Sequence, residues 1–474
     1  MSQIASADTS STSVKQAVWI ICGCALAATL SLFLLPAVTA PDPNAWLTWS
    51  KALLEGQGID YAHGPAWKPL PVLVTLPLGI PGKGFAAMSW LWLVRFSTLW
   101  VSGALYLLIR KDAGRLAGLV AAILPFTIRP WVNVGIAGES ETVALALVLT
   151  AALTLLSGRR TWTVVLLTLA GLSRPEVWPL LIALSAWQWR LGDKRATLEA
   201  GLGFVVLALF WAAAPKLLSI GSDSPFTMAS GHSLHNASWQ TILDNSLGVL
   251  PPKAWLLILL GVVGAWIKRS WIVLLLAAGS VLLVIEIALL WAIHPPISAT
   301  GYTPVLRYFA AAGVLACGVA GYGAEYLRDL FPEGRLRVVG TVLVGGLVAW
   351  SLYASIPGTR NSINRSRDIA SSTDGAIAAI ESAGGVKAIK PCFPFTVSNF
   401  SAISWDIARR LGVPLQDATT KPHAPSVAID FVGGNWVLAT APPADSRNRR
   451  VVGQAEGWQV VYYPGKSGCL RAAT

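Results

Sequence analysis

The chain has 474 residues, of which 54% are hydrophobic and only 13% are charged, whereas an average soluble domain carries about 25% charged residues. This excess of apolar residues excludes a soluble enzyme, a disordered chain and a disulfide-stapled secreted domain. The 22 Trp residues instead indicate a polytopic membrane protein with aromatic residues at the lipid boundary.

Apolar stretches long enough to cross about 30 Å of hydrocarbon predict an all-α polytopic bundle of about eleven transmembrane helices. The fifth and sixth expected spans are short and meet at Ser173-Arg174-Pro175-Glu176, so they could instead form one broken hairpin. No internal repeat is found, which weakens a transporter built from two related halves. The expected spans are 17–39, 86–109, 116–132, 140–157, 161–173, 176–189, 197–219, 254–267, 271–293, 305–326 and 339–357.

Positive charge predicts the orientation of this bundle, because loops rich in Lys and Arg stay in the cytoplasm. With the N-terminus inside, every predicted inner loop holds Lys or Arg, and the long loops 40–85 and 220–253 fall on the outer side. The net charge of +12 therefore reflects topology and requires no nucleic-acid partner.

The tail has no spanning stretch, so we expect a membrane domain, 1–357, followed by a small extracytoplasmic α/β domain, 358–474. This outer domain could bind an acceptor or cover the mouth of a site. Cys392 and Cys469 both lie in it, and an oxidising compartment would let them pair. The pattern predicts helices at 373–383 and 401–411 and strands at 427–431, 436–440 and 458–463.

The first outer loop begins with Asp42, and apolar residues at helical spacing follow from Trp46 to Leu54. We expect this helix to lie flat on the outer leaflet. Asp42 before Pro43 is typical of a helix N-cap. A capping carboxylate at the water–lipid boundary could also face a substrate, so both roles stay open.

Further polar residues lie at the outer ends of the spans. His63, Trp67 and Lys68 begin a proline-rich segment that predicts an interfacial or re-entrant piece. Acidic side chains at the depth of a span end are costly and often functional. The other outer clusters are Arg129 before Pro130, Glu139 with Glu141, Arg174 with Glu176, and Arg307 with Tyr308.

Three of these residues, Lys68, Arg174 and Arg307, are cations on the disfavoured side, each beside proline or an aromatic residue. A lipid phosphate is the natural partner for such a cation. The alternative is snorkelling to lipid headgroups, which fits Lys83 and Lys253 better.

The order of these features resembles the GT-C superfamily of multi-spanning glycosyltransferases, which use polyprenyl-phosphate-linked sugars. The shared features are an acidic residue after the first span, an amphipathic helix, a Pro-rich segment, an Arg-Pro break between short spans and a late Arg-Tyr pair. The similarity covers roughly residues 17–357. It is greatest to bacterial members of the protein mannosyltransferase and aminoarabinose transferase type.

The resemblance implies roles for individual residues. Asp42 would be the first-loop catalytic acid, and Glu139 or Glu141 the second acidic position. Asp42 lacks an acidic neighbour, so the sequence leaves metal dependence open. It predicts no metal ligands, and a divalent metal is the one cofactor that it leaves open. The residues expected to bind substrate are His63, Trp67, Lys68, Arg129, Arg174, Glu176, Arg307 and Tyr308, with the three cations contacting the phosphate.

The implied activity is transfer of a sugar from a polyprenyl-phosphate donor to an envelope glycan, lipid or protein. It would take place on the outer face of the bacterial cytoplasmic membrane, among membrane lipids, with Asp42 as general base. Two alternatives remain. A transporter or flippase of lipid-linked envelope precursors would explain the spans and the intramembrane Glu286, but not the long first loop. A non-catalytic envelope scaffold is the other.

Overall fold

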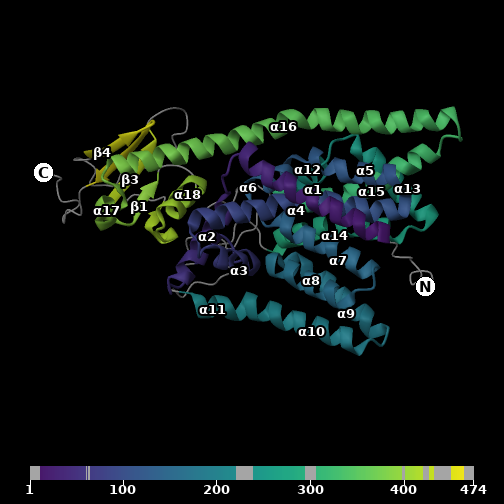
Figure 1. The fold of residues 1–474 in the computed structure, drawn as a ribbon, viewed down its shortest axis with the longest axis horizontal. Coiled ribbons are helices and arrows are strands. Elements are labelled where there is room, and N and C mark those ends of the chain that lie inside the picture. Colours follow the sequence, from purple (N-terminus) through teal and green to yellow (C-terminus); the bar gives the residue numbers. More distant parts are fainter. Residues whose placement is uncertain are drawn as a thin grey trace.

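The computed structural model describes residues 11–59, 61, 64–219, 239–293, 306–397, 401–419, 426–431 and 450–463. These residues form a helical bundle and a small α/β unit, and the long helix α16 (Arg335–Ser382) runs along the bundle and into that unit (Figure 1). Within the described residues, six helices are long and apolar enough to cross a membrane, or seven if one bent pair is a single span. This is the architecture of a multi-pass membrane protein.

Each segment predicted as a span lies on a helix or a broken helix, but only six or seven of the described helices, rather than about eleven, are long and apolar enough to be spans. The bundle consists of α1 (Ser11–Leu34), α2 (Pro41–Leu54), α3 (Pro69–Leu78), α4 (Lys83–Ala113), α5 (Arg115–Ile123), η2 (Leu124–Thr127), α6 (Arg129–Ala137), α7 (Glu141–Leu156), α8 (Arg160–Ser173), η3 (Pro175–Val177), α9 (Trp178–Arg190), α10 (Lys194–Ala208), η4 (Leu209–Ala213), α11 (Ala214–Leu218), α12 (Trp239–Gly248), α13 (Ala254–Lys268), α14 (Trp271–Ile293), η5 (Leu306–Phe309), α15 (Ala310–Asp329) and the first part of α16.

The helical chain is interrupted at Ile128 and at Arg174, and each interruption leaves polar residues at helix ends. The third predicted span bends by 73° between the segments 115–127 and 129–137, where Ile128 has extended backbone. The fifth and sixth spans are separate helices, because Arg174 is extended, with φ −150° and ψ 123°. That conformation is favoured for a residue that precedes proline.

The helix α16 continues through Pro357, the expected domain boundary, without a break. Residues 373–382 are therefore its last turns rather than a separate helix. A proline inside a helix removes one backbone hydrogen bond, but α16 packs against η2 and α6 on one side of this position and against the sheet beyond it. With this packing the helix continues from the bundle into the α/β unit (Figure 1).

The α/β unit contains a five-stranded sheet with the order β2-β1-β3-β5-β4. β1 pairs in parallel with β2 and β3, and β5 pairs antiparallel with β3 and β4. Its elements are α17 (Gly385–Ile389), η6 (Lys390–Cys392), β1 (Phe395–Val397), α18 (Ser401–Leu411), η7 (Leu415–Asp417), β2 (Ala418–Thr419), β3 (Ser426–Phe431), β4 (Arg450–Ala455) and β5 (Trp458–Tyr463).

The sequence predicted the helix 401–411 and the strands that became β3 and β5. The strand predicted at 436–440 lies outside the described residues. Cys392 is disulfide-bonded, whereas Cys22, Cys24 and Cys317 are free. Cys469, its predicted partner, also lies outside the described residues.

The short helix α2 is enclosed rather than laid flat on a surface. It packs against α3 on one side and against α18 of the α/β unit on the other, and its residues from Pro43 to Ser50 are all buried. The apolar stripe in the sequence does not predict the contact with α18, because α18 begins only at Ser401, far from α2 in the chain. The α/β unit thus contacts the segment that carries Asp42.

Candidate active site

Charged side chains from five separate segments meet beside the first turn of α2. The segments are that turn, the residue before α3, the turn between α6 and α7, the break between α8 and η3, and η5. We call this the charged cluster. Its members are Asp42, Lys68, Glu139, Glu141, Arg174, Glu176, Arg307 and Tyr308.

The predicted N-cap role of Asp42 is wrong. The N-cap of α2 is Ala40, whose backbone N–H donates to Ala137 O at 2.7 Å, and no side chain caps the helix. The helix begins at Pro41 rather than Pro43, so Asp42 lies inside the first turn. Its carboxylate Oδ2 instead lies 3.2 Å from Arg307 Nη2 and 3.6 Å from Lys68 Nζ.

Arg307 joins the carboxyl groups of Asp42 and Glu139 at the centre of the cluster. Its Nη1 donates to Glu139 Oε1 at 2.6 Å while its Nη2 donates to Asp42. The Tyr308 ring lies 5.2 Å from the Arg307 guanidinium and 5.9 Å from that of Arg174. A planar guanidinium suits this bridging and stacking, which a lysine could not reproduce.

The turn after α6 brings both glutamates to the cluster. Gly138 ends the helix in the left-handed region, with φ 81°, and a Cβ there would lie 3.1 Å from Leu91 Cδ2. Only glycine fits such a conformation without strain. Glu139 and Glu141 follow directly and are almost fully buried, at 3% and 6% exposed.

Arg174 forms the second half of the cluster. It is buried and forms an ion pair with Glu141 and another with Glu176, whose Oε1 lies 3.5 Å from Arg174 Nη1. The extended backbone before Pro175 ends α8 and directs this side chain toward the start of α7. Thus each of Asp42, Glu141 and Glu176 has a cationic partner within the cluster.

Lys68 completes the set of cations. Its ammonium lies 4.7 Å from the centre of the Trp46 ring, a cation–π contact that α2 itself supplies. The side chain is 7% exposed. Burial, together with the nearby Arg174 charge, lowers the pKa of Lys68, and Asp42 opposes this change. We call Lys68, Arg174 and Arg307 the site cations.

The two central carboxyl groups have pKa values displaced in opposite directions. Burial alone would raise the pKa of Asp42, but the charges of Arg307 and Lys68 outweigh it and hold that pKa below its ordinary value. Burial raises the pKa of Glu139 to about 8, although Arg307 opposes the shift. Two neighbouring carboxyl groups held in different protonation states are typical of acid–base sites.

The structure places two of the predicted residues away from the cluster. Trp67 is buried, donates from Nε1 to Phe210 O at 2.9 Å and packs on Trp49, so it supports the loop rather than facing the site. Arg129 is exposed and lies against Gly358 of α16. His63 lies outside the described residues.

Two features that the sequence did not predict complete the surroundings of Asp42. Trp46 was recognised only as part of an apolar stripe, but it is the surface on which Lys68 rests. Arg409 of the α/β unit donates to Asn44, two residues after Asp42. No local pattern could have indicated a pairing across 365 positions.

Some buried polar atoms in and beside the cluster have no hydrogen-bond partner among the described residues, namely Glu139 Oε2, Ser140 Oγ and Glu176 Oε2. The part of the chain that the structure describes holds no group of three His, Cys, Asp or Glu residues arranged for a metal ion.

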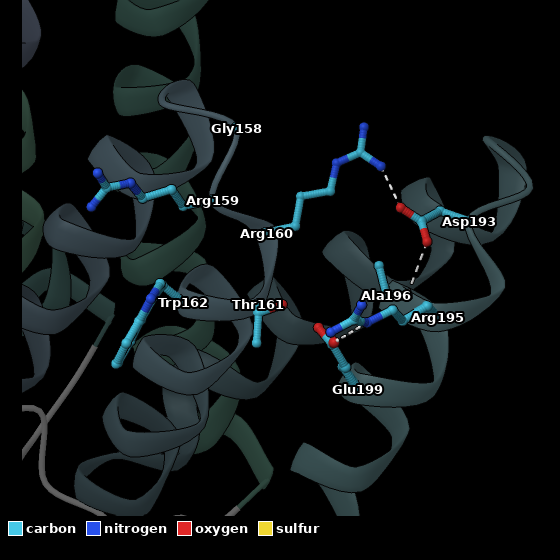
Figure 2. Close-up of a pocket in the computed structure, with 9 residues that line it drawn as sticks. All are labelled: Gly158, Arg159, Arg160, Thr161, Trp162, Asp193, Arg195, Ala196 and Glu199. Carbon is cyan, nitrogen blue, oxygen red and sulfur yellow. Dashed lines mark hydrogen bonds and ion pairs between the residues drawn. The ribbon is translucent and has the colours of Figure 1, made fainter. Parts of the chain in front are cut away.

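A surface hollow of about 520 Å³ lies elsewhere, between the N-terminal ends of α8 and α10. Figure 2 shows ion pairs between Arg160 and Asp193 and between Arg195 and Glu199, so most of the charged residues that line the hollow are paired with one another. Arg159 also lines this hollow. These residues belong to the loops predicted to face the cytoplasm, and none is part of the charged cluster.

No protein-family model and no curated protein matches the sequence. Solved structures match the fold. ArnT from Cupriavidus metallidurans bound to undecaprenyl phosphate is 12% identical with a TM-score of 0.53, over 96% of this chain and 98% of that one. Its apo form is 16% identical with a TM-score of 0.53, over 95% and 99%.

The archaeal oligosaccharyltransferase AglB from Archaeoglobus fulgidus, in complex with an inhibitory peptide and a dolichol-phosphate, is a further match. It is 12% identical with a TM-score of 0.50, over 88% of this chain and 69% of that one. The chain therefore shares its fold with ArnT and with this oligosaccharyltransferase, in agreement with the resemblance that its motifs indicated.

Proposed function

We propose that this protein is a membrane glycosyltransferase. It transfers a sugar from a polyprenyl-phosphate-linked donor to an acceptor glycan, lipid or protein on the outer face of the cytoplasmic membrane. The observation that carries the proposal is the convergence of Lys68 and Arg307 on Asp42, with Arg174 in the same cluster, from segments far apart in the sequence. The GT-C fold, shared with proteins solved with undecaprenyl phosphate and dolichol-phosphate, supports the same reading.

In this proposal Asp42 is the general base. Its carboxylate accepts the proton of an acceptor hydroxyl as that oxygen attacks the anomeric carbon of the donor sugar. The bond from the anomeric carbon to the phosphate oxygen breaks, and its electron pair leaves with the lipid phosphate. A single displacement of this kind inverts the anomeric configuration. The low pKa of Asp42 supports the role, because the group is ionised before the acceptor arrives.

The site cations stabilise the departing phosphate by charge-assisted hydrogen bonds. Lys68 and Arg307 are the same groups that pair with Asp42 in the structure. A bound phosphate competes with Asp42 for them. Donor binding therefore weakens the interactions that depress the pKa of Asp42, so the carboxylate becomes a stronger base when the substrate is in place.

Neutral Glu139 fits this exchange of partners. With a pKa of about 8, it is largely protonated at neutral pH and competes only weakly for Arg307. Arg174 keeps two carboxylate partners, Glu141 and Glu176, which fix its position next to the Tyr308 ring. The buried Glu139 Oε2 and Glu176 Oε2, without partners among the described residues, supply polar contacts for sugar hydroxyls.

The proposal is tested with membranes that contain the protein, incubated with a panel of radiolabelled polyprenyl-phosphate sugars, hexoses and pentoses separately. Transfer of label from one donor to an acceptor fraction is the expected result, and the donor that works identifies the sugar. Movement of labelled donor across the membrane without product would favour a flippase. No transfer from any donor in the panel would contradict the proposal.

A further inference from the structure

The helix α18 and the residue after it make two polar contacts with α2, one near each end of α2. Near the start of α2, Arg409 Nε donates to Asn44 Oδ1 at 2.7 Å. Near the end of α2, Lys51 Nζ donates to Gly412 O, just after α18, at 3.2 Å. The two helices also pack against each other, and in Figure 1 α18 lies beside α2.

The contact near the start belongs to a continuous polar network. Asp406 is fully buried and accepts from Arg409 Nε and from Arg410 Nε, each at 3.1 Å. Arg410 also pairs with Asp374 of α16. The network thus connects the long helix α16, through two adjacent arginines, to the first turn of α2.

On the α2 side the network ends in a buried amide. Asn44 is 0% exposed, and its Nδ2 donates to Thr39 O at 3.0 Å. Thr39 Oγ1 donates to the Asn44 side-chain oxygen in return. Asn44 therefore connects Thr39, which precedes α2, to Arg409. Asp42 lies between Thr39 and Asn44 in the sequence.

We propose that Arg409 is a positioning residue for the reaction, and that the α/β unit holds the first turn of α2 so that Asp42 meets Lys68 and Arg307. This inference rests on the proposed glycosyltransferase function for its kinetic consequences, but not for its structural ones. The backbone before α2 is already bonded to the bundle, through Ala40 N–H and Ala137 O. The Arg409–Asn44 bond adds a contact from the α/β unit at the same end of α2.

Arg410 provides a matched control. It is adjacent to Arg409, shares the Asp406 partner and also pairs with Asp374 of α16. Arg410→Ala thus perturbs the same network without removing the bond to Asn44. Asn44→Ala removes that bond from the other side and leaves the arginines with Asp406.

We would compare Arg409→Ala, Asn44→Ala, the double variant and Arg410→Ala in the full-length protein. Misplacing a reacting group by about 1 Å can cost about 100-fold in rate, so Arg409→Ala and Asn44→Ala should each lower kcat by roughly 10- to 100-fold. Their affinity for undecaprenyl phosphate should stay within about 3-fold of wild type, because the site cations are unchanged. The double variant should be no slower than the slower single variant.

Hydrogen–deuterium exchange of residues 40–50 supplies a readout that does not depend on activity. Exchange should speed up in Arg409→Ala and Asn44→Ala but not in Arg410→Ala. Equal losses of kcat in Arg409→Ala and Arg410→Ala, additive effects in the double variant, or unchanged exchange in Arg409→Ala would each overturn the inference. If the wild-type protein transfers no sugar while the exchange pattern is as expected, the proposed function fails and the positioning contact stands.

Discussion

Replacing Asp42 by Asn separates the catalytic role of this residue from any structural one. The substitution keeps the volume of the side chain and an oxygen that can accept from Arg307, but it removes the base. The helix does not depend on Asp42 for its cap, since Ala40 occupies that position. Arg307 also keeps its 2.6 Å contact with Glu139, and Lys68 keeps its contact with the Trp46 ring.

The magnitudes follow from these contacts. Loss of a general base should lower kcat about 10²- to 10⁴-fold, which is roughly 3–5 kcal/mol in activation free energy. The lost hydrogen bonds to charged groups should cost about 1–3 kcal/mol of stability, small enough for the protein to fold and insert. Affinity for the donor phosphate should be equal or higher, because Asp42 no longer competes for Lys68 and Arg307.

The assay measures transfer of labelled sugar and, separately, binding of undecaprenyl phosphate. Glu55→Gln is the matched control: it neutralises an exposed carboxylate at the other end of α2, where Glu55 pairs only with Lys51 among its described ion pairs. Full activity is expected of this control. Turnover of Asp42→Asn within about 3-fold of wild type would refute the role of Asp42, and Glu139 or Glu141 would then be tested as the base.

Three further predictions concern the site and its orientation. Alanine replacement of each site cation should weaken donor binding by about 1.5–3 kcal/mol. Arg129→Ala, the control, should leave donor binding unchanged. Wild-type affinity in all three site-cation variants would show that these cations only snorkel to headgroups. Glu139 ionises as the pH rises through about 8 and then competes with the donor phosphate for Arg307, so donor affinity should fall over that range. Glu139→Gln should remove the fall. The same pH profile in the wild-type and variant proteins would contradict this prediction. An impermeant thiol reagent applied from outside should label Gly231→Cys but not Gly158→Cys, and the opposite result would reverse the topology.

Much of the helical architecture was readable in the sequence because lipid imposes one strong rule. A segment inside hydrocarbon must satisfy its own backbone hydrogen bonds, so apolar runs become helices. The prolines at 125, 130 and 175 also mark the breaks where spans bend or end. The continuity of α16 through Pro357 could not be read in this way, because packing against η2, α6 and the sheet outweighs the local signal.

The sequence by itself determined which residues would be unusual: buried acids at span ends and cations on the disfavoured side, among them Asp42, Glu139 and Arg307. It could not decide which of these residues meet, because each comes from a different helix end and long-range pairing is set by how the helices pack. Only the tertiary structure shows that Arg129 lies away from the cluster, that Ala40 is the N-cap of α2 and that Arg409 donates to Asn44. Contacts between distant segments form when buried charges find partners, and a linear pattern carries no information on that choice.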